Sequence, residues 1–554
     1  MVYKDFYLLG ESPSQSHMVE IDIYHDFEAL KTVVADSFSV VDPSGLAFQT
    51  EQMKSLENMD EVLDWESPVA VSINGHHVRD VPSPDGLPFL GSYLQVYPDH
   101  LGNHQRLFST LGSVIKHTDL GRTTYLTNDP TVAFHAFQES PFWTKKINED
   151  HPLYQIKNPP AGVFVGDTDT QAWRDVHKFL PAALSPKAVR HYTPMMQATA
   201  QSSFKVFDEL DEKTEAWNTF SYMFKMASQA VGKLALGENF DHFSSIDAPL
   251  NEIVRTVGEV LELNKKVASK GAWYSHLPFG DPKRLRDVGA EFQAHCEKAI
   301  RKAQADHTGD LPIAEAALNA TSIADFAARA IDEKGNKLPR ENLLPAMAVV
   351  LGAGFTTTAS LLSWMIYSIV TYPGIQDKLL QELIDNGVTS DTEWTFDSTN
   401  SLPYLDRFIK EVQRLHNPSY QPARTALRDQ ILPGGYRFPK DAVLVCAVHH
   451  IHNNPKVWDD PAKFNPDRWG TEAVKNRPKG AYAPFALGPR SCIGFNFALQ
   501  EVKTVFPTLL YRYEFHRSGD DPIEYDPNFQ LIRPMNLYVR AKKRTEWPQP
   551  SKKE

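Results

Sequence analysis

The sequence predicts a mainly α-helical protein with minor β structure, preceded by a small α+β module. Three observations lead to this fold class. Amphipathic helical runs dominate the chain after residue 81, most of the strand-like alternation lies before it, and a turn-rich stretch at 81–91 separates the two parts. We therefore expect a small module at 1–81 and a main domain at 82–554.

The composition is that of an acidic globular chain. Its 554 residues include 57 Lys and Arg against 69 Asp and Glu, a net charge of −12, and 42% of them are hydrophobic. Disordered, collagen-like and nucleic-acid-coating chains differ from this composition, so we expect no nucleic-acid partner. Three cysteines, Cys296, Cys446 and Cys492, argue against a disulfide scaffold and for a reducing compartment. The amino terminus has too few apolar residues for a signal peptide or anchor, so we expect a soluble, cytoplasmic protein.

The elements of the module follow from short alternating patterns. We expect strands at 6–9 and 18–24, a helix at 27–37, a strand at 46–49, a short helix at 57–63 and a strand at 69–73. A hairpin followed by a helix and further strands predicts a ubiquitin-like β-grasp module. An irregular leader packed on the main domain is the alternative.

The main domain is predicted to be largely helical. Amphipathic runs lie at 187–210, 216–236, 249–269, 283–307 and 376–386, and strand-like pieces at 123–126 and 442–446. Residues 343–371 are apolar and uncharged, long enough for a membrane span. Because prolines, glycines and adjacent threonines interrupt this stretch, we expect a deeply buried central helix and no membrane span.

The segment from Phe485 to Gly494 contains a cysteine that is a candidate metal ligand. Its glycines let the backbone approach another group closely, and helical residues follow at 495–510. Backbone N–H groups at a helix start stabilise a thiolate, and Arg490, two residues before Cys492, can neutralise a carboxylate. The string resembles the haem-binding loop of the cytochromes P-450, Phe-x-x-Gly-x-Arg-x-Cys-x-Gly, at all five fixed positions. A buried structural cysteine is the alternative.

This resemblance implies a cytochrome P-450 fold for 82–554 and haem b as the cofactor. It makes Cys492 the axial thiolate ligand of the haem iron, with Phe485, Arg490 and Gly494 around the cofactor. Glu411 and Arg414 lie on one helix face, and with Arg468 they resemble the buried structural triad of the family. A solvated helix pair is the other interpretation of Glu411 and Arg414.

Further positions resemble the family's haem-carboxylate partners. Trp173 and His177 are four residues apart on a helical pattern, and His177 stands where the family often has Arg. Arg424 resembles another carboxylate partner. Phe164, between Gly162 and Gly166, resembles a loop over the distal haem face and is a candidate for the substrate pocket. Ordinary packing or solvent exposure is the alternative for each of these residues.

The long buried segment resembles the family's distal helix. Ala353 and Gly354 precede three threonines, and Thr357 occupies the position of the family's threonine, a hydroxyl group suited to proton transfer. Ala353 is a further pocket candidate, and Gly354 lets oxygen approach the backbone. Thr356 stands where the family usually has an acid, so protons must pass through water and hydroxyl groups. Back-bonding to helix carbonyls is the plain alternative, above all for Thr356 and Thr358.

The resemblance implies a monooxygenase that inserts one oxygen atom of O2 into a small, largely apolar organic substrate, such as a compound of secondary metabolism. The main domain leaves no length for flavin or nicotinamide domains. We therefore expect electrons from a separate NADPH-cytochrome P-450 reductase. The departure at Thr356 keeps open a haem-thiolate isomerase, a dehydratase or an oxidative coupling enzyme. A non-catalytic haem-binding protein is the least favoured alternative.

Overall fold

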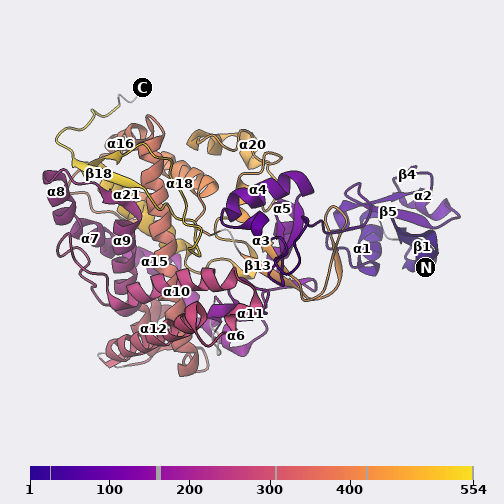
Figure 1. Ribbon diagram of the computed structural model, residues 1–554, viewed down its shortest axis with the longest axis horizontal. Helices are drawn as coiled ribbons and strands as arrows, with labels where there is room; N and C mark the ends of the chain where they lie inside the picture. The colour runs from indigo at the N-terminus through magenta and orange to yellow at the C-terminus, as the bar shows by residue number, and fades with distance from the viewer. Residues whose placement is uncertain (25, 158–163, 306–308, 420–421, 552–554) are drawn as a thin grey trace. The chain divides into compact units, whose positions relative to one another are not determined.

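The computed structural model describes residues 1–554 apart from 25, 158–163, 306–308, 420–421 and 552–554 (Figure 1). The chain forms two compact units, each assembled from three stretches. The first unit consists of residues 1–151, 421–451 and 478–491, and the second of 152–420, 452–477 and 492–554. The first contains most of the β structure, and the second is mainly helical.

The first residues of the first unit form a five-stranded sheet with the order β2-β1-β5-β3-β4. The elements, indigo in Figure 1, are β1 (Val2–Leu8), β2 (His17–Ile21), α1 (Phe27–Ser37), β3 (Leu46–Gln49), β4 (Ser55–Leu56), α2 (Met59–Asp64) and β5 (Val69–Ile73). β1 pairs antiparallel with β2 and parallel with β5. Alternate residues such as Phe6 and Val71 point into a core that α1 covers with Leu30 and Val34. This is the β-grasp arrangement that the sequence predicts.

The rest of the first unit is built on two further sheets, with strand orders β7-β8-β16-β13-β9 and β14-β15-β6. The strands are β6 (Arg79–Asp80), β7 (Val114–Asp119), β8 (Arg122–Thr127), β9 (Trp143–Thr144), β13 (Ala423–Ala426), β14 (Gln430–Leu432), β15 (Tyr436–Phe438) and β16 (Val443–Cys446). The helices are α3 (Tyr93–Val96), α4 (His100–Leu111), α5 (Pro130–Phe137) and α19 (Val448–His452), which ends at the first residue of the next stretch of the second unit.

The hairpin β14–β15 joins the β-grasp sheet to the rest of this unit. Ile431 lies in the core of the β-grasp module, whereas its neighbour Leu432 lies in the adjacent core. The backbone N–H of Ile431 donates to Ser39 O, and that of Val41 donates to Ile431 O, each over 3.0 Å. One short strand therefore contributes side chains to two hydrophobic cores.

The second unit is a helical assembly around the long helix α15 (Arg340–Thr371) (Figure 1). Its other helices are α6 (Gln171–Ala183), α7 (Pro186–Ser202), α8 (Phe204–Glu212), α9 (Thr219–Leu236), α10 (Glu252–Ala268), α11 (Ala272–Ser275), α12 (Gly280–Ala305), α13 (Ile313–Asn319), α14 (Ile323–Arg329), α16 (Ile375–Asp385), α17 (Phe396–Asn400), α18 (Pro403–Leu415), α20 (Glu472–Lys475) and α21 (Phe495–Arg512). The strands are β10 (Trp217–Asn218), β11 (Leu311–Pro312), β12 (Ala330–Ile331), β17 (Tyr513–Ser518) and β18 (Tyr538–Lys543).

Helix α15 is long and apolar enough to cross a membrane by length and composition. In its most apolar window, 67% of the residues are buried inside the protein. Its middle packs closely against α9, where the rings of Phe355 and Phe224 are 5.2 Å apart. This is the central core helix that the sequence predicts for 343–371.

The observed elements differ from the expected ones in several places, among them the following two. The run at 187–210 is divided into α7 and α8, because Ser203 caps one helix and begins the next. The strands β17 and β18, which pair over six residues each, were not predicted. Their residues directly follow a long apolar helix or lie near the carboxyl terminus.

Candidate active site

The cysteine loop contributes Phe485 and Arg490 to the first unit, and Cys492 and Gly494 to the second. Within the first unit, Gly488 has φ +72°, and a Cβ there would lie 2.3 Å from the carbonyl oxygen of Phe137. An L side chain is therefore excluded at Gly488 by both conformation and space. Arg490 is buried and ends a short 3₁₀ turn, while Phe485 is half-buried.

Cys492 is the one exposed cysteine of the three, since Cys296 and Cys446 are buried. Desolvation by the surrounding protein raises the pKa of its thiol, while the hydrogen bond from the backbone N–H of Gly494 opposes the rise. Desolvation raises the pKa of the Cys446 thiol to about 12. Gly494 caps α21, and a Cβ there would meet no atom within 4 Å in the described structure. Cys492 is therefore the cysteine best placed to meet an external group.

Arg424 on β13 is a buried cation with unsatisfied donors. Its side chain is 2% exposed, and Nη1 donates to Ala423 O over 2.9 Å. Nε and Nη2 are buried and have no hydrogen-bond partner in the described structure. Burial lowers the pKa of the guanidinium, and the nearby Cys446 and Glu139 oppose that shift. Because an unpaired buried donor is costly, this site calls for an anionic acceptor.

In the second unit, Trp173 and His177 lie one turn apart on α6. Their rings stack with 4.6 Å between centroids and 21° between planes. Thr170 caps this helix by accepting a hydrogen bond from the N–H of Trp173 over 3.3 Å. The cap fixes where α6 begins and so places both rings on one half-buried face.

The structure brings Glu411, Arg414 and Arg468 together in the second unit. Glu411 accepts from Arg414 Nε and Nη2 and from Arg468 Nε, each over 3.0 Å, and the side chains of Glu411 and Arg414 are fully buried. The remaining donors of the two arginines reach backbone oxygens, including His452 O and Asp459 O. Trp469, which the sequence did not single out, also donates from Nε1 to Glu411 over 2.9 Å. This saturated network ties α18 to the segment that follows α19.

The three threonines of α15 all bond back to the helix. Thr356, Thr357 and Thr358 donate to the carbonyl oxygens of Gly352, Ala353 and Gly354 over 3.0, 2.9 and 3.2 Å. Thr356 and Thr358 are buried, whereas Thr357 is partly accessible. Ala353, one turn before Thr357, is exposed, so these two residues share an accessible stripe of the helix.

Gly354 serves packing against α9. A Cβ at this position would lie 3.1 Å from Cγ1 of Val231, so the absence of a side chain lets α9 approach α15. Val231 carries no local signal in the sequence that would mark it as a functional residue. Phe164 is 41% exposed, and Gly162, the first glycine of its loop, lies outside the described residues.

Each unit, taken by itself, has a feature that suits a haem group. In the first unit, Arg424 has buried donors that a cofactor carboxylate could accept from, and in the second unit Gly494 leaves space at the start of the helix that follows Cys492. Among the described residues, no three His, Cys, Asp or Glu side chains converge to hold a metal ion. A single cysteine thiolate suffices for haem iron, whose other ligands come mostly from the cofactor itself.

Comparisons with known proteins point the same way. The family model described as Cytochrome P450 matches residues 81–539. The chain is 46% identical over 552 residues to a protein of Emericella nidulans named Cytochrome P450 monooxygenase alnD, and the match covers 99% of each chain. It is also 34% identical over 213 residues to a mouse protein named Leukotriene-B4 omega-hydroxylase 3, covering 38% of this chain and 40% of the mouse protein.

A solved structure, the cytochrome P450DA heme domain, superposes with a TM-score of 0.73 at 21% identity. The match covers 84% of this chain and 98% of that domain. The fold likeness thus spans nearly the whole of the solved domain.

Proposed function

This chain belongs to the cytochrome P450 family, and on that basis we propose that it inserts one oxygen atom of O2 into a small, largely apolar organic substrate. It is a haem-thiolate monooxygenase by family. We place the haem domain at 82–554 and a β-grasp module at 1–81. The match of the family model from residue 81 onward supports this boundary.

The exposed side chain of Cys492 carries the assignment of the site. It lies shortly before helix α21, in a loop whose backbone conformation at Gly488 only glycine can adopt. We assign Cys492 as the thiolate ligand of the haem. When bound, the haem supplies the iron at which O2 is activated with two electrons. Arg424, Arg490, Trp173 and His177 are assigned to hold its carboxylates. Phe485 and Gly494 are assigned to the surface against which the cofactor lies.

We assign proton transfer to the hydroxyl group of Thr357. It shares the accessible stripe of α15 with Ala353, a position suited to the substrate pocket, as is the exposed Phe164. Thr356 is buried, and its hydroxyl group is engaged with Gly352 O. A proton must therefore reach Thr357 through water and not through a neighbouring carboxylate.

The absence of a carboxylate at position 356, where the family usually has an acid, supports a second candidate function. A haem-thiolate isomerase, dehydratase or oxidative coupling enzyme needs a different supply of protons, and Thr356 at the usual acidic position favours this reading. Such an isomerase or dehydratase would turn over without O2 or a reductase. The monooxygenase would need both.

Electrons for the monooxygenase are proposed to come from an NADPH-cytochrome P450 reductase, because oxygen insertion consumes two electrons that a haem domain does not itself supply. A substrate of secondary metabolism and a soluble, cytoplasmic enzyme complete the proposal. The mouse relative named as a hydroxylase of leukotriene B4 supports an apolar substrate class, since its name denotes a lipid as the molecule acted on.

The dithionite-reduced, carbon-monoxide difference spectrum of the wild type beside Cys492→Ala and Cys446→Ala tests the site. We expect a strongly red-shifted Soret band in the wild type and in Cys446→Ala, and its loss in Cys492→Ala. Retention of the band in Cys492→Ala would refute the ligand assignment. Turnover of apolar substrates with and without NADPH and reductase then separates oxygen insertion from isomerisation.

A further inference from the structure

The β-grasp module carries almost all the net charge of the protein. Residues 1–81 contain 15 Asp and Glu but only 4 Lys and Arg, a net charge of −11 out of −12. The remaining 473 residues contain 54 acidic and 53 basic side chains, and are nearly neutral. A small module with so dense a negative field attracts cationic surfaces and repels anionic ones.

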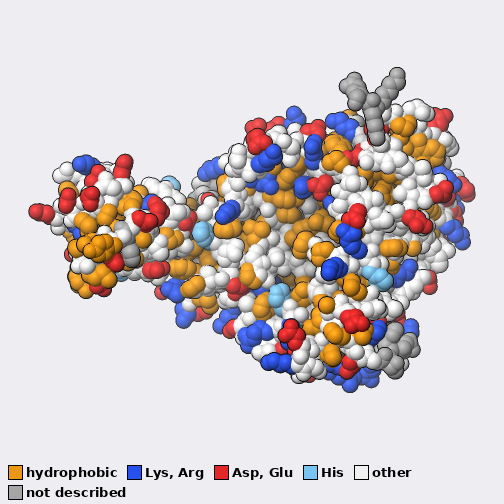
Figure 2. Space-filling view, turned by 180° about the vertical axis from the view of Figure 1, so that it is seen from behind, with side chains coloured by type: hydrophobic (Ala, Val, Ile, Leu, Met, Phe, Trp, Pro, Cys, Tyr) orange, Lys and Arg blue, Asp and Glu red, His pale blue; other side chains and the backbone are white. Residues whose placement is uncertain are grey.

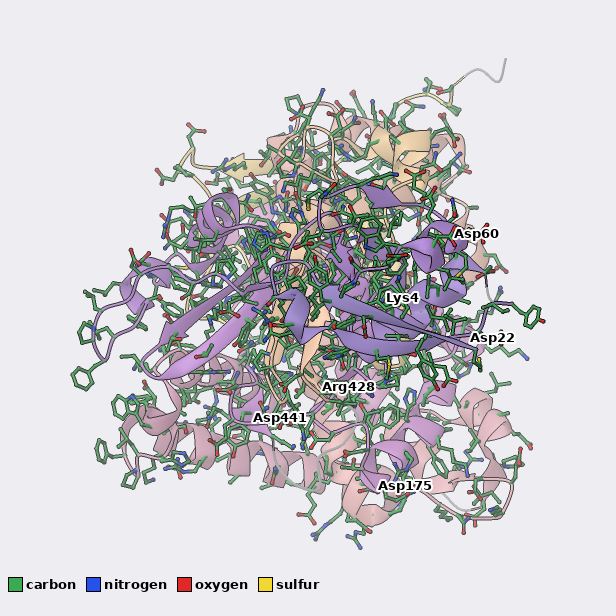
Figure 3. All side chains as sticks on the ribbon, turned by 90° about the vertical axis from the view of Figure 1, so that its right-hand side faces the viewer. Lys4, Asp22, Asp60, Asp175, Arg428 and Asp441 are labelled. Carbon is green, nitrogen blue, oxygen red and sulfur yellow. The ribbon has the colours of Figure 1, made fainter. Side chains whose placement is uncertain are left out.

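The acids of the module are mostly exposed. A run of six carboxylates with Lys54 as the only base among them comprises Glu51, Glu57, Asp60, Glu61, Asp64 and Glu66. Figure 3 looks onto this module and labels Lys4, Asp22 and Asp60 on it. Lys4 is nearly buried and lies close to Asp5 and Glu66, whose charges oppose the lowering of its pKa by burial. One of the module's few cations is thus already engaged with its acids.

The outer face of the β1–β2 hairpin mixes these acids with apolar side chains. In the strand register, Tyr3 lies opposite Glu20 and Asp5 opposite Met18. All four point away from the core that Phe6 and Val19 enter. Tyr3 is 59% and Met18 70% exposed. We call these four residues the hairpin face. Figure 2 shows hydrophobic side chains gathered on the module beside carboxylates.

The same hairpin lies at the border of the sheet. β2 is the terminal strand in the order β2-β1-β5-β3-β4, so in the described structure its outer edge has no neighbouring strand. Just beyond the strand, after Asp22, come Ile23 and Tyr24, 48% and 90% exposed. An edge strand with exposed apolar side chains can receive a further strand through backbone hydrogen bonds.

We propose that the β2 edge and the hairpin face are a docking surface for an extended, Lys- and Arg-rich segment of another protein. The segment adds to β2 as a strand. Its basic side chains meet Asp5 and Glu20, and its apolar ones meet Tyr3 and Met18. A second copy of this chain is a poor occupant, because its own module carries the same charge and the rest of the chain is nearly neutral.

Binding of a fluorescent peptide of alternating Lys and Val to the full-length haem-loaded protein tests this proposal. The face variant is Asp5→Lys with Glu20→Lys. The matched control is Asp36→Lys with Asp64→Lys, which makes the same charge change at exposed positions at the ends of α1 and α2. We expect the face variant to weaken binding about tenfold more than the control, because close charges contribute more than distant ones.

Two further measurements distinguish specific binding at the β2 edge from nonspecific electrostatic attraction between the peptide and the acidic module. Peptide binding should slow amide hydrogen exchange in β2, and a Lys–Ser peptide of equal charge should bind more weakly than the Lys–Val peptide. Equal loss of affinity in the two variants, or no protection of β2, would overturn the proposal. Self-association of the wild type that Asp5→Lys with Glu20→Lys abolishes would identify a second copy as the occupant and refute a basic partner.

Discussion

The guanidinium of Arg424 lies over the ring of Phe137, with 5.2 Å between Cζ and the ring centroid. Phe137 is the last residue of α5, and its carbonyl oxygen fills the space at Gly488 that a side chain would need. The cation, the aromatic ring and the cysteine loop are thus linked within the first unit. A ring face stabilises a cation without accepting a conventional hydrogen bond, so the buried donors of Arg424 remain open to an anion.

Arg424→Met should affect the apoprotein and the holoenzyme in opposite directions. Without cofactor, the change removes a buried cation with unpaired donors, and we expect the free energy of unfolding to rise by about 1–3 kcal/mol. With cofactor, the change removes a carboxylate partner, and haem should transfer faster to apomyoglobin. Arg428→Met is the control, because Arg428, labelled in Figure 3, lies 5.0 Å from the Phe142 ring but is exposed. A lower free energy of unfolding in the Arg424→Met apoprotein than in the wild-type apoprotein would contradict this assignment.

Gly488→Ala should impair folding of the apoprotein, whereas Gly494→Ala should impair haem binding. At Gly488, a Cβ would meet the Phe137 carbonyl at 2.3 Å with φ at +72°, so we expect the apoprotein itself to be destabilised. At Gly494, φ is −93° and a Cβ meets no protein atom within 4 Å. Gly494→Ala should therefore fold normally and lose haem affinity. Thermal unfolding of the apoproteins and haem titration measure the two effects, and normal haem binding by Gly494→Ala would argue against cofactor contact there.

Thr357→Val and Thr356→Val should separate the two threonines. Both changes keep the side-chain shape and remove a hydroxyl group. We expect Thr357→Val to lower product formation on the order of 10²-fold, as loss of a proton donor does, with NADPH consumption diverted to hydrogen peroxide. Thr356→Val should change both rates little, because that hydroxyl group is buried, whereas the equally back-bonded hydroxyl group of Thr357 is partly accessible. Measurement of product and peroxide per NADPH distinguishes them, and equal losses would refute the division of roles.

Glu501 should make the protein less stable as pH rises. Its carboxyl group on α21 is fully buried, and neither oxygen has a hydrogen-bond partner in the described structure. Burial raises its pKa well above the usual value. Above the ordinary glutamate pKa of about 4.3, the folded state therefore binds a proton that the unfolded state has lost, and stability falls as pH rises toward the folded pKa.

Glu501→Gln removes this titration. We expect the variant to resemble the wild type near pH 4.5, and to become progressively more stable than the wild type from there toward pH 8, as urea unfolding would measure. Glu393→Gln, at an exposed position, is the control and should leave the pH profile unchanged. A parallel pH dependence in the wild type and Glu501→Gln would show that Glu501 is ionised in the fold.

Much of the fold was predictable from local patterns. The helix at Phe27–Ser37 matches its prediction at both ends, because Asp26 accepts a hydrogen bond from the Ala29 N–H and fixes the start. The β-grasp order followed from alternation and element sequence alone. The division at Ser203 was not predicted, because the apolar period continues across it while the backbone changes helix. Strand β17 was missed because Tyr513, its first residue, continues the apolar pattern of α21.

Site residues that belong to a sequence motif were predictable, whereas residues whose roles depend on tertiary packing were not. Glu411, Arg414 and Arg468 meet as their spacing and charges suggested. Phe137 and Val231 have no local signal, since their roles arise from Arg424 and Gly354, which are distant in sequence. The buried orientation of Thr356 likewise depends on which face of α15 the neighbouring helices cover.

The shared strand β14 makes the amino-terminal module a poor candidate for removal. Removing residues 1–81 would deprive Ile431 of the hydrophobic core in which it is now buried and of its backbone hydrogen bonds with Ser39 and Val41. It would also take away β6, the parallel neighbour of β15. In the shortened enzyme, the β14–β15 hairpin would expose apolar side chains and an unpaired strand edge to water. We expect such a protein to aggregate or to self-associate through this edge. A loss of activity after such a truncation would therefore reflect reduced solubility, and would not by itself show that the module takes part in catalysis.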